Sequence, residues 1–286
     1  AAPTAPTATD NCAGTITGTT TTTFPITAQG TTVVTWTYTD ANSNVSTQIQ
    51  NVIIDDVTAP VFGVSPANVT VECDASVLPA NTGQGTATDN CGGTVAVTYA
   101  DTTVAGTGNN SVITRVWTAT DDNSNATTYT QTITVVDTTA PTFTNSPASL
   151  TVECSASSAP SATGTATATD NCSATDNVTV AYADTTVAGT GNNSVITRVW
   201  TATDQNSNAS TYTQTITVVD TTAPVANVTA LSDITAECSV AAPTAPTATD
   251  NCAGTITGTT TTTFPITAQG TTVVTWTYTD ANSNVS

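Results

Sequence analysis

The chain has 286 residues, of which 21 are acidic and only two, Arg115 and Arg198, are basic, so its formal net charge is −19. Such an acidic surface repels phosphate backbones, which excludes nucleic acid as a partner, and no apolar stretch reaches the roughly 20 residues that span a bilayer. Without histidine or lysine, the usual bases that activate a serine or cysteine nucleophile are missing, so we expect no enzyme.

Repeats organise the whole sequence. Residues 1–46 recur unchanged at 241–286, and a shorter unit of about 80 residues lies inside this period. Each unit is expected to run from one Pro-containing linker to the next. This predicts full modules at 58–137 and 138–220, a partial module without its first strand at 1–57, and a partial module without its last strand at 221–286.

Within a module, the predicted elements follow one another in a fixed order. A strand ending in Glu-Cys (Cys73, Cys154 and Cys238) precedes a Thr-Asp-Asn-Cys turn (Cys12, Cys91, Cys172 and Cys252). A strand with period-two alternation follows, with Val34, Trp36 and Tyr38 on one face and Arg115, Trp117 and Ala119 in the aligned positions. A turn and a closing strand complete the module, with Ile133 and Val135 matched by Val52 and Ile54. Short strands between regular turns predict an all-β sandwich with Trp117 and Trp200 buried.

The combined motifs carry a resemblance that covers the whole chain. The order Glu-Cys, Ala-Thr-Asp-Asn-Cys, Trp-Thr-Ala-Thr-Asp-x-Asn-Ser-Asn and Thr-Val-Val-Asp-Thr-Thr-Ala-Pro resembles the hyalin-repeat (HYR-like) immunoglobulin-type modules. Such modules occur in giant cell-surface adhesins of bacteria, including gliding-motility adhesins of the Bacteroidota. The resemblance implies a tandem array of Ig-like β-sandwiches, secretion, and an adhesive or filamentous role without catalytic residues.

Seven cysteines, spread singly, indicate structural disulfides formed in an oxidising compartment. We expect three short loops, closed by Cys73–Cys91, Cys154–Cys172 and Cys238–Cys252, each worth roughly 3 kcal/mol. Cys12 is expected to have no bond within the chain, because the 240-residue identity puts its partner three residues before Ala1. A reactive thiol that joins chains and a buried free cysteine are the alternatives for Cys12.

An Asp-x-Asn-x-Asn loop recurs in every module. Oxygen ligands at positions 1, 3 and 5 open many calcium loops, whereas Asp and Asn also form ordinary Asx turns. Both interpretations stay open, and no cofactor other than calcium is expected. The loop residues are Asp40, Asn42 and Asn44; Asp121, Asn123 and Asn125; Asp204, Asn206 and Asn208; and Asp280, Asn282 and Asn284. Aspartates of the Thr-Asp-Asn turns (Asp10, Asp89, Asp170 and Asp250) and of the linkers (Asp56, Asp137 and Asp220) could complete such sites.

Asp-Thr-Thr segments resemble the Asp-Ser/Thr acceptor motif for O-linked glycans in Bacteroidota. The acceptors would be Thr102, Thr138, Thr185 and Thr221; the alternative is that these are plain strand-end and linker residues.

The function expected first is a structural or adhesive one, in which secreted tandem modules form a stalk or fibre on a cell surface. One alternative is an adhesin module that binds a glycan or a surface, and another is a subunit of a self-assembling extracellular filament or sheath. The expected partners are the neighbouring modules, other copies of the chain and surface glycans.

Overall fold

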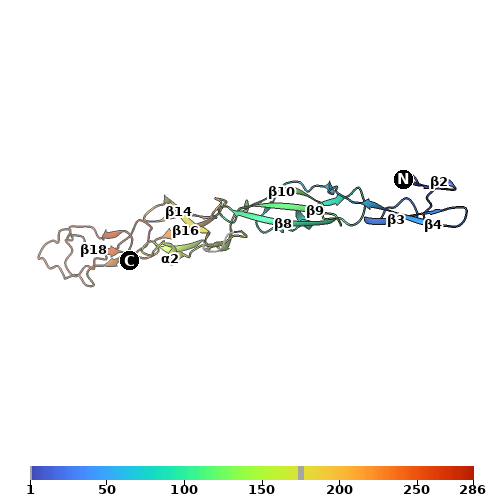
Figure 1. Ribbon diagram of the computed structural model, residues 1–286. Coiled ribbons are helices and arrows are strands. Elements are labelled where there is room, and N and C mark those ends of the chain that lie inside the picture. Colours follow the sequence, from blue (N-terminus) through green and yellow to red (C-terminus); the bar gives the residue numbers. More distant parts are fainter. Residues whose placement is uncertain (1, 173–176) are drawn as a thin grey trace. The chain divides into compact units, whose positions relative to one another are not determined.

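The computed structural model describes residues 2–172 and 177–286, which Figure 1 shows as a succession of strands. The helices in these residues are two single turns, α1 (Pro79–Thr82) and α2 (Pro160–Thr163), so the all-β class is confirmed. None of the described helices is long and apolar enough to cross a membrane. The chain divides into two compact units. The first comprises Ala1–Val69, Ser76–Val104 and Val112–Thr134, and the second comprises Thr70–Ala75, Ala105–Ser111 and Val135–Ser286.

The N-terminal segment consists of two antiparallel hairpins, β1 (Thr7–Asp10) with β2 (Gly14–Thr17) and β3 (Gly30–Thr39) with β4 (Val45–Ile54). β3 buries alternate side chains, as its period of two predicts. Val34, Trp36 and Tyr38 are 0%, 4% and 5% exposed and form one core cluster. The indole of Trp36 donates to the Oε1 atom of Gln50 on β4 at 2.9 Å, which satisfies its polar atom inside the core.

The next segment holds the first complete set of strands. They are β5 (Val61–Val64), β6 (Val69–Glu72), β7 (Thr86–Thr88), β8 (Ala96–Ala105), β9 (Ser111–Thr120) and β10 (Ala126–Val136). β5 pairs with β7, and the other four strands form a sheet in the order β6-β10-β9-β8. Trp117 on β9 is only 2% exposed, as predicted. Gln131 on β10 is fully buried; it accepts from the Trp117 indole at 3.2 Å and donates to the carbonyls of Ala67 and Thr82.

Arg115 occupies the buried face of β9, where the pattern predicts an apolar side chain. It is 1% exposed and forms a two-pronged ion pair with Asp101 on β8, with both N–O distances 2.8 Å. It also donates to Thr82 Oγ1 at 2.9 Å, and its guanidinium lies 4.5 Å from the ring centroid of Tyr99. Arg198 repeats this arrangement with Asp184. Both basic residues of the sequence are therefore bound within their own sheets.

The third segment repeats the same set. Its strands are β11 (Thr142–Asn145), β12 (Leu150–Glu153), β13 (Thr167–Thr169), β14 (Thr179–Ala188), β15 (Ser194–Thr203) and β16 (Ala209–Val219). The sheet order is β12-β16-β15-β14, and β11 pairs with β13. β12 runs parallel to β16 with Glu153 opposite Val219, whereas β13 is antiparallel to β11 with Thr169 opposite Thr142. Trp200 is 3% exposed, as predicted, so the tandem β-sandwich class holds for this segment as well.

The last segment contains one small sheet of β17 (Val225–Ala226), β18 (Thr247–Asp250) and β19 (Gly254–Thr257). β18 and β19 pair in the register of β1 and β2, whose sequences are the same. Residues 270–279 repeat the sequence of β3 but form only isolated bridges, such as Thr277 with Thr259. In the first copy this strand pairs along its whole length with β4, and only Val45 and Ser46 of β4 recur in the second copy.

Candidate functional site: the junctions between modules

The linkers that follow β4, β10 and β16 define three junctions, which we number in chain order. Each linker begins with an aspartate and ends with a proline whose side chain is fully buried: Asp56–Pro60, Asp137–Pro141 and Asp220–Pro224. Each aspartate accepts the backbone N–H two residues later at 3.1–3.3 Å, which forms a tight local turn. The three aspartates are only 5–7% exposed, so the start of every linker is held inside the protein.

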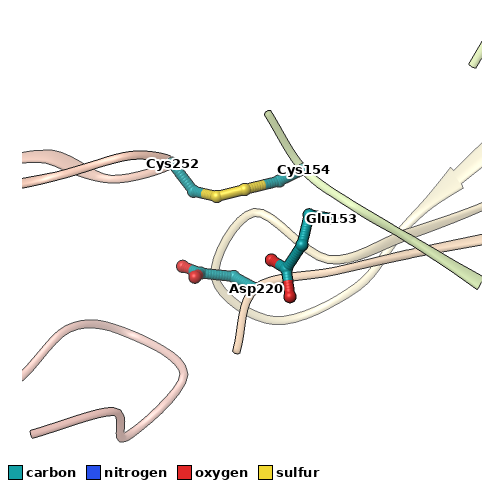
Figure 2. Close-up of side chains that lie close together, drawn as sticks. All are labelled: Glu153, Cys154, Asp220 and Cys252. Atoms are coloured by element: carbon teal, nitrogen blue, oxygen red, sulfur yellow. A yellow bond between two sulfur atoms is a disulfide. The ribbon is translucent and has the colours of Figure 1, made fainter. Parts of the chain in front are cut away.

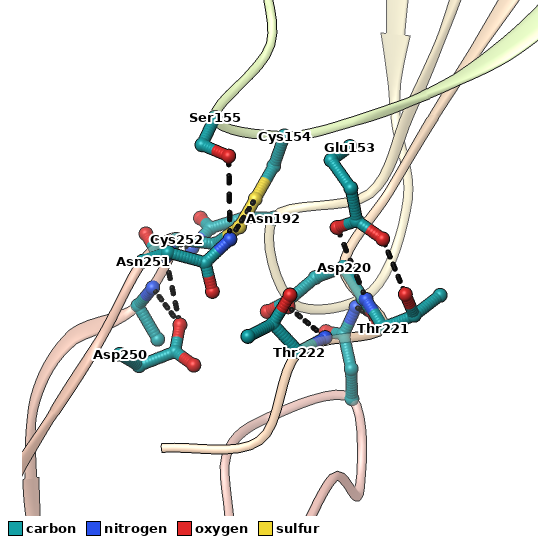
Figure 3. The surroundings of a disulfide bond; sticks show 12 residues. Glu153, Cys154, Ser155, Asn192, Asp220, Thr221, Thr222, Asp250, Asn251 and Cys252 are labelled. Carbon is teal, nitrogen blue, oxygen red and sulfur yellow. Dashed lines mark hydrogen bonds between the residues drawn. A yellow bond between two sulfur atoms is a disulfide. The ribbon is translucent and has the colours of Figure 1, made fainter. Parts of the chain in front are cut away.

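The disulfides of the structure join different cysteines from those predicted. Cys73 bonds to Cys172 and Cys154 bonds to Cys252, with Cα–Cα distances of 5.7 and 5.9 Å (Figure 3 shows the second). The predicted pairs Cys73–Cys91, Cys154–Cys172 and Cys238–Cys252 are therefore wrong. Cys91 and Cys238 are free and exposed; Cys12 is also free, as predicted. Each disulfide links a module to the module that follows it.

Strand register explains this correction. Cys154 follows Glu153 at the end of β16, and its N–H donates to the Val219 carbonyl at 2.8 Å. Cys172 lies at the other end, because Asp170 sits beside Asp204, the residue that opens the loop before β16. The 11 residues of β16 separate the two ends by roughly 36 Å, whereas a disulfide requires Cα atoms within about 7 Å. Cys154 and Cys172 of this module therefore cannot meet.

The Asp-x-Asn-x-Asn loops are hydrogen-bonded turns. In each loop the first carboxylate accepts the N–H groups of both asparagines and the side-chain amide of the second, at 2.6–2.9 Å. In Asp40 these hydrogen bonds, above all the one from the Asn44 side chain, lower the pKa of the carboxyl. In Asp280 burial raises the pKa, but the combined hydrogen bonds outweigh it and the net shift is downward. The predicted loop residues thus form turns in their own right.

The asparagine side chains of these loops have a second role that the sequence analysis missed. At the second junction, Asn208 Nδ2 donates to the Asp137 carbonyl at 3.1 Å, and Asn206 Nδ2 donates to Asn110 Oδ1 at 3.0 Å. Asn284 and Asn282 make the same bonds to Asp220 and Asn193 at the third junction, at 3.1 and 2.6 Å. At the first junction, Asn125 Nδ2 donates to the Asp56 carbonyl at 2.9 Å. The sequence held a signal for this second role, because an Asx turn needs only the aspartate, whereas two asparagines follow it in every copy.

A glycine loop of the preceding module lies against these asparagines. Gly108 and Gly191 have φ angles of +58° and +64°, and a Cβ atom on either would overlap the Oδ1 atom of Asn206 or Asn282 respectively. Asn109 and Asn192, which follow the two glycines, donate their side-chain amides to the carbonyls of Cys172 and Cys252 (Figure 3 includes Asn192). The loop is therefore fitted to the module after it.

Carboxylates converge at the second and third junctions. Asp137, Asp170 and Asp204 each place a carboxylate oxygen within 4.8 Å of the other two, and Asp220, Asp250 and Asp280 do the same. We call these two groups the aspartate triads. Burial raises the pKa of Asp137 and of Asp220, and the other two aspartates of each triad add to this effect.

The remaining acid groups near the junctions are occupied differently. At the third junction Glu153 lies close to Asp220 and the disulfide (Figure 2), but it accepts hydrogen bonds from the backbone and hydroxyl of Thr221. The sulfur atoms of Cys154 and Cys252 are bonded to each other and offer no thiolate. At the first junction the Cys91 thiol lies with Asp56 and Asp89. Although the residue as a whole is exposed, local desolvation of the sulfur and then its hydrogen bond to Asp56 raise the pKa of this thiol.

The four candidate glycosylation sites fall into two environments. Thr102 and Thr185 are exposed on β8 and β14, strands at the edges of their sheets. The hydroxyls of Thr138 and Thr221 instead donate to Glu72 and Glu153. Glycosylation of these residues stays a prediction.

Comparison with known proteins assigns the modules. A family model described as "HYR-like domain with 4 cysteines" matches residues 1–54, 63–135 and 224–286. The chain belongs to this HYR-like family. The resemblance seen in the sequence is thus confirmed at the level of the repeat, whereas the bacterial gliding-adhesin type stays a prediction. In this HYR-like chain each matched segment holds at most two cysteines.

Solved structures with some similarity to the HYR-like chain include tandem cadherin domains. Extracellular domains 1–4 of protocadherin gamma B7 share 13% identity over 89% of this chain and 76% of that one, with a TM-score of 0.31. Domains EC1–4 of Drosophila N-cadherin share 13% over 90% and 74%, with a TM-score of 0.23. Among curated proteins no relative matches the chain. The family model therefore carries the assignment.

Proposed function

We propose that this chain is a load-bearing segment of an extracellular stalk or fibre, in which covalent and polar junctions hold consecutive HYR-like modules together. The observation that carries the proposal is the pair of disulfides between modules, Cys73–Cys172 and Cys154–Cys252. A disulfide within a module would stabilise that module alone, whereas these two bonds connect neighbouring modules across the second and third junctions, beside the peptide linker. Such bonds persist in oxidising, extracellular compartments, which supports secretion.

The noncovalent contacts support the same role. At each of the second and third junctions, asparagine amides, a glycine loop, a buried proline and a disulfide from separate parts of the sequence meet at the same boundary between two modules. Interfaces fixed at several points resist bending about a linker, which a stalk requires and which a flexible chain of independent modules does not provide. The sequence offers no residues for ordinary nucleophilic catalysis, since it lacks histidine and lysine. Binding of glycans and association with other copies stay predictions.

The test is the spread of angles between neighbouring modules in single-chain electron micrographs. All variants carry serine at Cys12, Cys91 and Cys238, so that free thiols cannot link chains. We expect a narrow angular distribution when both disulfides are intact, and a clearly wider one when Cys73 and Cys172 are also replaced by serine. Modules that are freely jointed with both disulfides closed would overturn the proposal.

A further inference from the structure

We infer that the second and third junctions each bind one divalent cation, which lies between the three carboxylates of the aspartate triad. The chemistry of these ligands favours Ca²⁺. This inference goes beyond the proposed function, because a stalk held by disulfides requires no metal. The candidate ligands are Asp137, Asp170 and Asp204 at one junction and Asp220, Asp250 and Asp280 at the other.

The distances between the carboxylate oxygens of each triad suit a shared ion. Oxygen ligands lie about 2.4 Å from Ca²⁺, so two ligands of one ion are at most about 4.8 Å apart. In both triads a carboxylate oxygen of each aspartate lies within 4.8 Å of the other two. Oxygens this close together can share one ion after small movements of the side chains.

The negative charge of the triads has no countercharge from a basic side chain. Asp220, Asp250 and Asp280 are 6%, 4% and 7% exposed, and buried carboxylates are costly without a countercharge. The protein has no side chain to supply one, because Arg115 and Arg198 are its only basic residues and are paired with Asp101 and Asp184. A divalent cation would neutralise most of the charge of a triad.

Each triad also contains a buried carboxylate oxygen that has no hydrogen-bond partner among the described residues. Asp137 and Asp250 are both at least nine-tenths buried, and the Oδ2 atom of each accepts no hydrogen bond from the residues that the structure describes. The other oxygen of Asp250 accepts the N–H groups of Cys252 and Ala253, at 2.8 and 2.7 Å, as Figure 3 shows. Buried polar atoms in folded proteins are almost always satisfied, so a buried carboxylate oxygen without a partner at both junctions points to a ligand.

The ligand set selects the kind of metal. All candidate ligands are carboxylate oxygens, the sequence has no histidine, and the cysteines at both junctions are in disulfides. Hard oxygen donors favour Ca²⁺ or Mg²⁺ over transition metals. Ca²⁺ accepts irregular geometry and six to eight oxygens, including water, whereas Mg²⁺ demands a near-ideal octahedron.

The chain contains its own control for this inference. Asp10 and Asp40 occupy the same positions in residues 1–46 as Asp250 and Asp280 do in residues 241–286, where the sequence is identical. In the first copy both aspartates are only half-buried, and among the described residues they belong to no triad with a linker aspartate. Among the described residues, the same local sequence therefore forms an aspartate triad at 241–286 but not at 1–46.

The experiment is calorimetric titration of the oxidised, EDTA-treated chain with CaCl₂ at physiological salt. We expect two equivalents of Ca²⁺, with dissociation constants of about 10⁻⁴–10⁻³ M, the range of extracellular modules. Asp137→Asn and Asp250→Asn should each remove one equivalent, whereas Asp10→Asn should leave two. Calcium should also raise the thermal midpoint, and EDTA should reverse the rise.

Folding is checked by circular dichroism and by the mass of the oxidised protein, and Asp280→Asn should abolish the same equivalent as Asp250→Asn. The inference is overturned if no heat is released up to ~10 mM Ca²⁺, or if Asp250→Asn and Asp10→Asn have equal effects. Either result could coexist with an angular spread that still depends on Cys73 and Cys172, so the two proposals fail separately.

Discussion

The overlap of the two disulfides makes a quantitative prediction about extension under force. Cys154 lies within the loop closed by Cys73 and Cys172, so the shortest covalent path through the chain skips most of its residues. This path runs from residue 1 to Cys73, back from Cys172 to Cys154, and on from Cys252 to Ser286, about 124 residue spans. At ~3.4 Å per span the fully unfolded, oxidised chain should extend to ~420 Å, and the reduced chain to ~970 Å.

Single-molecule force spectroscopy with handles at both termini measures this difference directly. The pairing expected from sequence, with three short loops, would leave about 235 spans and an extension of ~800 Å. An oxidised chain that extends to ~800 or ~970 Å would therefore refute the disulfide connectivity. Serine variants of the three free cysteines should behave as the parent chain does, which controls for disulfide exchange during pulling.

Three substitutions test the packing that surrounds the junctions and cores. Gly191→Ala should cost about 1–3 kcal/mol more in thermal unfolding than Gly254→Ala, because both glycines have positive φ but only Gly191 lies against Asn282; equal losses would contradict the fitted-loop interpretation. Arg115→Met should cost roughly 2–4 kcal/mol in urea unfolding, since it leaves its buried hydrogen-bond partners unsatisfied, and a loss below ~1 kcal/mol would argue against that role. Gln131→Leu preserves side-chain volume but leaves three polar groups without their hydrogen-bond partner, so the free energy of unfolding should fall by about 2–4 kcal/mol. An unchanged stability would contradict this role of Gln131.

The sequence predicted those features that depend on residues near one another in the chain. Alternation along β3 identified Val34, Trp36 and Tyr38 as buried, because a strand turns successive side chains to opposite faces. Arg115 follows the same alternation, but the burial of its charge depends on Asp101, which lies 14 residues earlier on the neighbouring strand. The same spacing of Asp184 and Arg198, directly opposite each other in β14 and β15, was the available signal.

Disulfide pairing could not be predicted from spacing, because two spacings recur in a repeat protein. Separations of 14 or 18 residues within a module and of 98 or 99 residues between modules both recur. The choice between them depends on which end of the sandwich each cysteine occupies, and strand register determines this.

The triads were suggested only as a combination of three aspartates from separate motifs. Asp280 is buried beside the linker aspartate Asp220, whereas Asp40 in the same local sequence is half-buried.

The division of each junction between two modules has a consequence for how such a protein can grow by gene duplication. In residues 58–137, the end that faces the preceding module contains Asp89 and the Asp121 loop, and the end that faces the following module contains Cys73, Gly108 and Asp137. Residues 138–220 carry the same two ends. Every complete module therefore holds one half of each kind. A tandem gene that lengthens or shortens by unequal recombination in whole modules would keep both halves at each new boundary.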